Sequence, residues 1–406
     1  MKKESWLRFG GIILILSFAL TSPLGAQTKP SGKPILLGVV DSYTGAIALQ
    51  AADSKMGIET AIEDINSSGG ILGRPIVAYY RDAKLKPEIS AEQTRRLIHE
   101  DKVDFLFAVA PTTVVKPASE EAKKEKKLLF TAATSAFLTE KEGHRYIFRF
   151  SPNSRSWAGV PSIYMSKNFP NLKKWITLCP DVAFGRELVG FFKDALKKRM
   201  PDVVFVDAIF TPLGEADFSP YISAMLGKDA DAIFSNVWAS DQVSLIRQAL
   251  PMGLFKKFKF VTYQSMDVRR PLGKEMPEGI VVWDYFEVSS PPFKSIVDKF
   301  VTKTKVYPGG MTLLPYYSLM YLKAAAEKAG SIDTERVIDA MKGLTLDTPW
   351  GPVTMRKYDN QADLGAVVGI TKHVPAYEFA ILDKLEYVSG KELLMPEEEI
   401  RKMRGE

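Results

Sequence analysis

Apolar segments of strand length alternate with helical segments along this chain, and they do so in two successive blocks. In the first block, strands are expected at residues 35–40, 76–80 and 105–110, and the last of these is apolar on both faces. Segments 50–66 and 87–100 lie between them and are expected as helices. Alternation of this kind places parallel strands side by side with helices on both faces of a sheet.

The alternation starts afresh after Phe150 and forms a second unit of similar size. We therefore predict an α/β fold of two doubly wound parallel-sheet lobes, with crossings between them near Phe150, Val282 and Trp350. A cleft between such lobes closes by hinge motion when a ligand touches both. The expected ranges are 1–26 for a signal peptide, 33–150 with 283–350 for the first lobe, 151–282 with 351–376 for the second lobe, and 377–406 for a C-terminal extension.

The first 26 residues have the pattern of a secretory signal peptide. Basic residues precede an apolar run at 9–20, and Leu24-Gly25-Ala26 offers a cleavage site after Ala26. The apolar run is short for a membrane span, and no later stretch is long enough for one. We expect a protein exported to the periplasm, in which the single cysteine, Cys179, excludes an internal disulfide.

The remaining composition argues against a nucleic-acid-binding protein and against an enzyme. The net charge of +6 is modest for 406 residues, and lysines alternate with glutamates at 120–127, as on a solvated helix face. His99, His144 and His373 are scattered, and none has the spacing of a zinc site. No nucleophile motif and no glycine-rich phosphate loop is present. We predict no catalytic residue, no metal and no cofactor.

Small hydroxyl residues follow two strands that are expected to be neighbours. Thr112 and Thr113 come after the strand at 105–110, and Thr134 and Ser135 come after an apolar run at 128–130. Ligands of open parallel sheets bind at the carboxyl ends of the strands. Hydroxyls and free backbone N–H groups at a helix start suit a carboxylate or a phosphate. Ordinary helix capping is the alternative interpretation of each turn.

Several motifs together resemble the periplasmic branched-chain amino-acid binding proteins. The likeness extends over roughly residues 33 to 370, and the order and spacing of the motifs carry it. The motifs are Asp41-Ser42-Tyr43-Thr44-Gly45, Asn66-Ser67-Ser68-Gly69-Gly70-Ile71-Leu72-Gly73-Arg74, Lys116-Pro117-Ala118-Ser119, Ala132-Ala133-Thr134, Phe184-Gly185-Arg186-Glu187-Leu188 and Asp217-Phe218-Ser219.

This resemblance implies a two-lobed clamp with a three-segment hinge, the type I periplasmic-binding fold. It implies a receptor of an ABC importer that binds an amino acid or a related small carboxylate, aromatic acids included, and delivers it to permease subunits in the inner membrane. We expect a monomer. A periplasmic ligand sensor for a signalling receptor is the alternative, because the same fold supports both uses.

The resemblance also implies site residues. In the family the first lobe holds the ligand carboxylate, and the matching positions here are Thr112, Ala132, Ala133 and Thr134. Matching positions in the second lobe are Phe184, Trp238 and Gln264, while Tyr43 and Gln50 are further candidates from the first lobe.

The sequence departs from the family at the site for the ligand ammonium group. Gln264, which is neutral, stands where the family has an acidic residue, and Phe184 stands where it has a tyrosine. A buried ammonium without a carboxylate partner costs several kcal/mol. Either the ligand is an acid without an α-ammonium group, which Phe184, Trp238, Tyr43 and Tyr263 would suit, or another acidic residue supplies the charge. The candidates for that residue are Asp181, Asp241 and Asp267.

Overall fold

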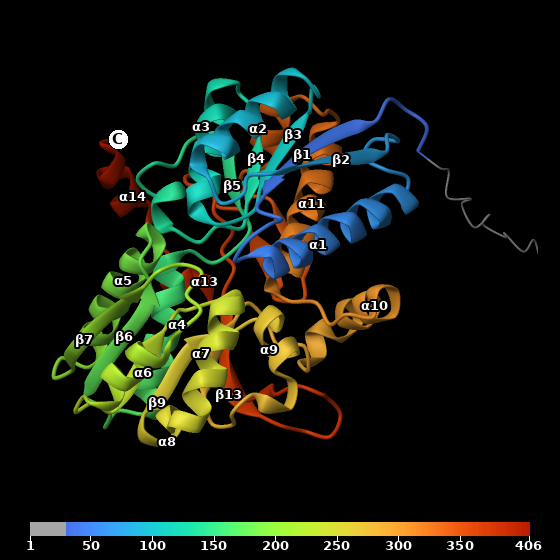
Figure 1. The fold of residues 1–406 in the computed structure, drawn as a ribbon. Helices are drawn as coiled ribbons and strands as arrows, with labels where there is room; N and C mark the ends of the chain where they lie inside the picture. The colour runs from blue at the N-terminus through green and yellow to red at the C-terminus, as the bar shows by residue number, and fades with distance from the viewer. Residues whose placement is uncertain (1–29) are drawn as a thin grey trace, which may run out of the picture.

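The computed structural model describes residues 30–406, so the expected signal peptide at 1–26 lies outside the described residues. The chain forms two α/β lobes, each built around its own sheet (Figure 1). The predicted fold class is therefore confirmed. Within residues 30–406, no helix is long and apolar enough to cross a membrane.

The first lobe is built on a five-stranded parallel sheet. Its strands are β1 (Ile35–Asp41), β2 (Ile76–Asp82), β3 (Phe105–Ala108), β4 (Leu129–Thr131) and β5 (Ile147–Arg149), in the order β2-β1-β3-β4-β5. The helices of this lobe are α1 (Ala48–Ser67), α2 (Pro87–His99) and α3 (Thr112–Lys124), the 3-10 turn η1 (Ala136–Leu138), and the late helices α11 (Gly310–Ala329) and α12 (Thr334–Met341).

Helices cover both faces of this sheet. Alternate residues of each strand point to opposite faces, and apolar side chains lie on both. Val39 shares a core with Ile58 of α1 and Leu322 of α11. Val40, the next residue, shares the opposite core with Leu97 of α2. The strands are thus buried on both faces, as the unbroken apolar runs predict.

The second lobe is built on a seven-stranded sheet. Its strands are β6 (Lys174–Pro180), β7 (Val204–Thr211), β8 (Ala232–Ser235), β9 (Lys259–Tyr263), β10 (Val281–Asp284), β13 (Ala366–Lys372) and β14 (Ile381–Val388), in the order β14-β13-β10-β9-β8-β6-β7. The helices are α4 (Ser154–Asn168), α5 (Ala183–Arg199), α6 (Ser219–Leu226), α7 (Ala239–Met252), α8 (Leu254–Lys257) and α9 (Met266–Leu272), followed by the turn η2 (Gly273–Glu275). Its core holds a stack in which the ring of Phe234 lies 3.8 Å from Phe192 and 5.3 Å from Trp283.

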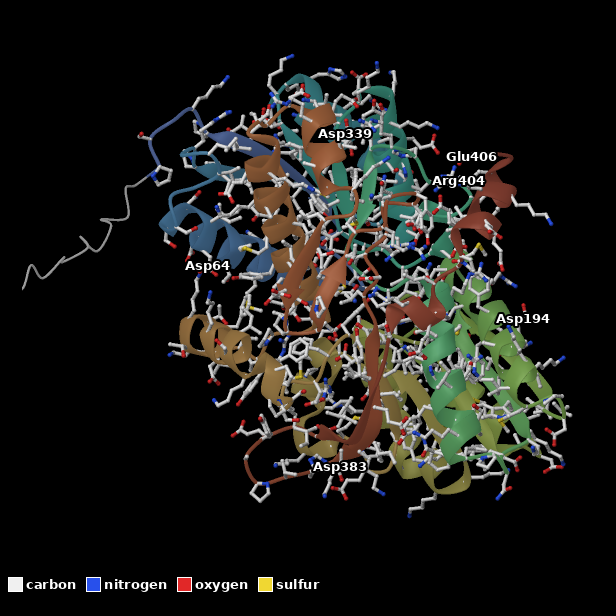
Figure 2. All side chains as sticks on the ribbon, turned by 180° about the vertical axis from the view of Figure 1, so that it is seen from behind. Asp64, Asp194, Asp339, Asp383, Arg404 and Glu406 are labelled. Atoms are coloured by element: carbon white, nitrogen blue, oxygen red, sulfur yellow. The ribbon has the colours of Figure 1, made fainter. Side chains whose placement is uncertain are left out.

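The predicted C-terminal extension at 377–406 is wrong at its start. Strand β14 pairs antiparallel with β13, and β13 pairs antiparallel with β10, so both strands belong to the second sheet. The two strands continue the backbone pairing of the sheet beyond β10, and β14 becomes its edge. Only α13 (Gly390–Leu393) and α14 (Glu397–Arg404) follow β14. Arg404, labelled in Figure 2, ties α14 to the first lobe through the carbonyls of Thr139 and Glu140.

Three crossings join the lobes: β5 to α4, β10 to α11, and the hairpin of β11 (Thr345–Thr348) and β12 (Gly351–Thr354) to β13. The second crossing contains η3 (Pro291–Phe293) and α10 (Lys294–Thr304). Trp350 of the third crossing packs against the other two: its ring lies 5.9 Å from that of Phe150 in the first crossing and 6.3 Å from that of Phe286 in the second. We propose that the lobes move as the predicted ranges, with β10 extending the first segment of the second lobe to Asp284 and β14 extending its second segment to Val388.

Asp64 of α1 connects the second crossing to the first lobe (Figure 2). Its carboxylate accepts hydrogen bonds from Lys299 Nζ of α10 at 2.7 Å and from the Tyr316 hydroxyl of α11 at 2.6 Å. Helices α10 and α11 are therefore anchored on the first lobe, although they follow the second lobe in sequence.

Candidate functional site

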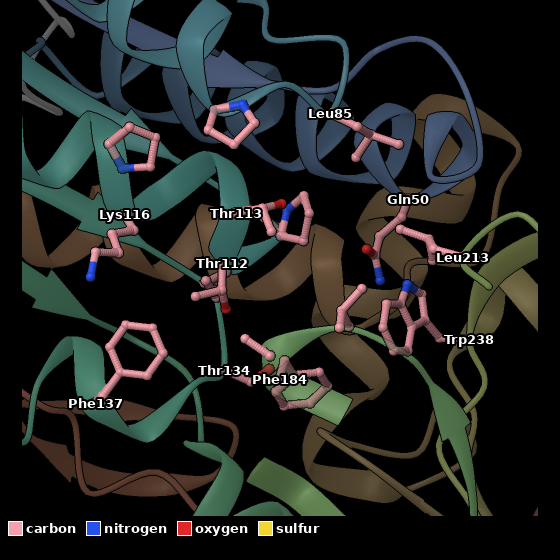
Figure 3. A pocket seen from close by; sticks show the side chains of 18 of the residues that line it. Gln50, Leu85, Thr112, Thr113, Lys116, Thr134, Phe137, Phe184, Leu213 and Trp238 are labelled. Atoms are coloured by element: carbon pink, nitrogen blue, oxygen red, sulfur yellow. The ribbon is translucent and has the colours of Figure 1, made fainter. Parts of the chain in front are cut away.

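A cavity of about 790 Å³ lies between the two lobes, and residues after strands of both sheets line it. From the first lobe come Gln50, Thr112 and Thr134, and from the second come Phe184 and Trp238 (Figure 3). Strand carboxyl ends of the two lobes thus face one shared space, as the sequence predicts for a ligand site.

Thr112 is the first residue of α3 and lines the cavity. The N–H groups of Thr112 and Thr113 lie in the first helical turn, where no intrahelical acceptor exists, and the helix dipole makes this end positive. The Thr112 hydroxyl donates to Ser135 Oγ at 2.9 Å, which joins α3 to the turn after β4. These groups form one half of a wall suited to an anion.

Ala132, Ala133 and Thr134 form the other half, but their amides differ in availability. The Ala132 N–H donates to the Val109 carbonyl at 3.2 Å, and the Ala133 N–H donates to Thr131 Oγ1 at 3.0 Å. These two amides hold the turn together and already have acceptors within the chain. Thr134 N–H has no acceptor in the described part of the chain.

Arg149 lies behind this turn and is fully buried. Its Nη1 donates to the carbonyls of Ala133 at 3.2 Å and Ser135 at 2.6 Å. In a trans peptide the N–H points opposite to the C=O, so this contact turns the N–H of Thr134 away from the guanidinium. Burial lowers the pKa of Arg149 to about 10, which leaves it a cation at neutral pH.

Aromatic rings make up much of the remaining wall. Phe184 and Trp238 meet edge to face at 5.8 Å. Trp157 stacks on Tyr285 at 4.4 Å and lies 5.2 Å from Tyr263. All five rings line the cavity, so an apolar or aromatic body fits between them.

Two predicted site residues, Gln264 and Tyr43, do not line the cavity. Gln264 directly follows β9, and its buried side chain donates from Nε2 to Met276 Sδ at 3.5 Å. Its neighbour Tyr263 lines the cavity instead, because successive residues of an extended chain point to opposite sides. The ring of Tyr43 packs edge to face on Tyr80 of β2 at 6.2 Å. Neither side chain lines the cavity in this structure, and a contact of either residue with the ligand stays a prediction.

None of the three alternative aspartates lines the cavity. Asp181 pairs with Arg186 at 2.7 Å, Asp241 accepts from the Gly214 N–H at 2.7 Å, and Asp267 is buried on α9. Among the described residues, the acidic groups on the wall are Glu120 and Glu121. They lie two turns along α3 from Thr112, which is about 12 Å along the helix axis. The carboxylate nearest to Thr134 in the chain's contacts is Glu187, which accepts from the Ala136 N–H at 3.1 Å and does not line the cavity.

Sequence reasoning missed Asn236, Trp157 and Tyr285, all of which line the cavity. Asn236 is only 1% exposed, and it directly follows β8. The signal was present, since a polar residue directly after a buried strand marks the same sheet edge as Thr112 and Thr134. Tyr285 carries the same signal, since it directly follows the buried strand β10, whereas Trp157 lies in α4 and carries none.

Comparisons with known proteins agree with this geometry. A family model described as periplasmic binding protein matches residues 34–369. The Leu/Ile/Val/Thr-binding protein of Salmonella typhimurium is 25% identical over 353 residues, which cover 86% of this chain and 91% of that protein.

Solved structures share the fold of this chain. A solute-binding protein of an ABC transporter from Rhodopseudomonas palustris, in complex with 3,4-dihydroxybenzoic acid, has a TM-score of 0.79 at 22% identity and covers 88% of this chain and 98% of its own. The branched-chain amino acid transporter substrate-binding protein of Streptococcus pneumoniae, in complex with isoleucine, has a TM-score of 0.76 at 21% identity and covers 88% and 99%. At these identities the likeness shows the fold.

Proposed function

Because the chain belongs to the periplasmic binding protein family, we propose that it is the extracytoplasmic solute-binding component of an ABC importer. It binds one small carboxylate between its lobes, and closure presents a surface to the permease in the inner membrane. The observation that carries this proposal is the inter-lobe cavity with hydroxyl and amide donors on one wall. The protein acts in the periplasm as a monomer after its signal peptide is removed.

The carboxylate lies against Thr112, Thr113 and Thr134. The hydroxyls of Thr113 and Thr134 and the free N–H groups donate to it, and each charge-assisted bond contributes roughly 1.5–3 kcal/mol. The positive end of α3 and the cation of Arg149 favour a negative guest at this place. No histidine or cysteine lines the cavity among the described residues, which supports binding without turnover.

The ligand is an acid without an α-ammonium group, and an aromatic ring suits the cavity best. Supporting observations are the six aromatic side chains on the wall, Phe137 included, and the distance of Glu120 and Glu121 from the threonines. A ligand ammonium beside the carboxylate would find no carboxylate on the nearby cavity wall, and an unpaired buried ammonium costs several kcal/mol. That cost is a large share of the roughly 8 kcal/mol of a micromolar complex. The Rhodopseudomonas palustris relatives in complex with 3,4-dihydroxybenzoic acid and with 4-hydroxybenzoate are consistent with this ligand class.

Calorimetry on the purified protein tests the proposal. Benzoate-type acids should bind with a dissociation constant in the micromolar range, about 8 kcal/mol, while leucine should give no measurable heat of binding. Thr134→Val should weaken the binding of every acid about tenfold or more, since it removes a hydroxyl that donates to the carboxylate. Tight binding of leucine without binding of any acid would overturn the proposed ligand class.

A further inference from the structure

Two buried polar groups on the second-lobe wall of the cavity have no hydrogen-bond partner in the described part of the protein. They are Oδ1 of Asn236 and the hydroxyl of Tyr263. Asn236 is 1% exposed and Tyr263 is 4% exposed. Buried polar groups in native proteins almost always have partners, so two unpaired groups on one cavity wall require that something else supplies the bonds.

The two groups come from adjacent positions of the sheet. Strands β8 and β9 are parallel neighbours, with Ser235 opposite Thr262. Asn236 and Tyr263 are the next residues of these strands, so they sit side by side at the carboxyl edge. They belong to the second lobe, whereas Thr112 and Thr134 belong to the first. A guest that touches both walls therefore meets anion-binding groups at one end and neutral polar groups at the other.

We propose that the ligand is a hydroxy acid whose hydroxyl group lies away from its carboxylate, donates to Oδ1 of Asn236 and accepts from the hydroxyl of Tyr263. This inference rests on the proposed carboxylate-binding function and narrows its substrate class to hydroxylated aromatic acids of the hydroxybenzoate type. A hydroxyl group has one donor and two acceptor sites, so it satisfies an amide oxygen and a phenol at once.

An ammonium group fits this place less well than a hydroxyl. Asn236 is neutral, and no carboxylate of the described residues lines the second-lobe wall. An ammonium has three donors and no acceptor, so the proton of the Tyr263 hydroxyl would have no hydrogen-bond acceptor. Burial raises the pKa of Tyr263 well above its ordinary value, so this phenol remains a donor at neutral pH.

The test is calorimetry of the purified protein with benzoate, 3-hydroxybenzoate, 4-hydroxybenzoate, 4-methoxybenzoate and leucine. In the wild-type protein, at least one hydroxybenzoate should bind about tenfold or more tightly than benzoate, because benzoate leaves the polar pair unsatisfied. The methoxy acid lacks the donor and should lose this advantage. These comparisons need no variant and do not depend on how a substitution folds.

Two variants locate the effect. Asn236→Leu removes the amide at similar volume, and the preference for the hydroxy acid over benzoate should fall to about one. Tyr263→Phe should remove part of the preference. Thr177→Val is the matched control, because the Thr177 hydroxyl of β6 is buried and unpartnered but lies outside the cavity. This control should keep the full preference.

The outcomes separate this inference from the proposed function. Equal binding of benzoate and both hydroxybenzoates overturns the inference and leaves carboxylate binding in place. Tight leucine binding that Asn236→Leu weakens overturns the inference in favour of an ammonium group. Absence of binding by every acid overturns the proposed function and the inference with it.

Discussion

At Arg149 a fully buried guanidinium binds four neutral acceptors and no carboxylate within the described chain. The acceptors are the carbonyls of Ala133 and Ser135, the side-chain oxygen of Gln361 and the hydroxyl of Thr139. Glu140, Asp359 and Glu187 lie near enough to favour the cation electrostatically, but none of them bonds to it, so its burial remains costly. A ligand carboxylate on the other side of the Ala133–Thr134 peptide would offset part of that cost, so the arginine both shapes the turn and favours an anion.

Arg149→Lys tests this positioning role. Lysine keeps the charge but loses the planar fork that holds two carbonyls at once, so the Thr134 N–H loses its fixed direction. We expect every acid to bind about tenfold more weakly, with the preference among acids unchanged. Calorimetry measures the affinities, and circular dichroism checks the fold. Arg145→Lys is the control, since Arg145 forms partly exposed pairs with Glu335 and Asp339. Unchanged affinity in Arg149→Lys would assign the arginine to folding alone.

At the scale of elements, helices α1 and α9 carry an ion pair between the lobes. Arg270 of α9 donates to both oxygens of Asp53 of α1, at 2.6 and 2.8 Å. Asp267, one turn earlier on α9, is buried, and neither of its oxygens has a partner among the described residues. Burial raises the pKa of Asp267 to about 7; the charge of Asp53 adds to this rise, and Arg270 opposes it.

This pKa makes folding stability depend on pH. The folded state holds the Asp267 proton more tightly than the unfolded state, whose carboxyl titrates near 3.8, so stability falls as pH rises from about 4 to 7 and then levels off. Asp267→Asn should remove this slope, about 1.4 kcal/mol per pH unit, and should be more stable than wild type at pH 8. Urea unfolding at pH 5 to 8 measures the difference.

The Asp267→Asn variant keeps a second contribution to the pH dependence of stability, because burial also raises the pKa of Asp41 to about 7. The exposed residue Asp339 provides a control, and Asp339→Asn should keep the wild-type profile. Parallel pH profiles for Asp267→Asn and wild type would show that Asp267 is ionised in the folded protein at every pH tested.

The elements and the first-lobe wall of the site are predictable from the sequence, while the second-lobe wall is only partly so. Apolar runs that end in Thr112 or Thr134 mark strand ends, because those residues leave the buried sheet. Matching the family position by counting along the chain selects Gln264, one residue after Tyr263, which lines the cavity. A shift of one residue places the side chain on the opposite face of the strand. The antiparallel β13 and β14 escape prediction because pairing across long sequence distances leaves no local pattern.

At the scale of the whole molecule, three crossings meet beside the anion-binding turn. Gln361 of the third crossing accepts from Arg149 Nε at 2.5 Å and donates to the Ser151 carbonyl of the first crossing at 2.6 Å. Arg149 in turn holds the carbonyl of Ala133. If the turn at 132–134 holds the ligand carboxylate as proposed, we expect a rotation of the lobes to pull on this turn and a bound carboxylate to restrain the rotation.

Cys179 reports whether a bound acid stabilises both lobes. It is the single cysteine of the chain, it is buried in β6 of the second lobe, and burial raises the pKa of its thiol to about 12. A thiol reagent can reach it only when the second sheet opens.

If the acid contacts both lobes, a hundredfold excess over the dissociation constant adds about 2.7 kcal/mol to the free energy of opening, and labelling should slow about a hundredfold. Leucine should not slow it, and denatured protein should react at once. Labelling that is indifferent to a bound acid would mean that the second lobe opens with the ligand still held, and that the first lobe alone binds it.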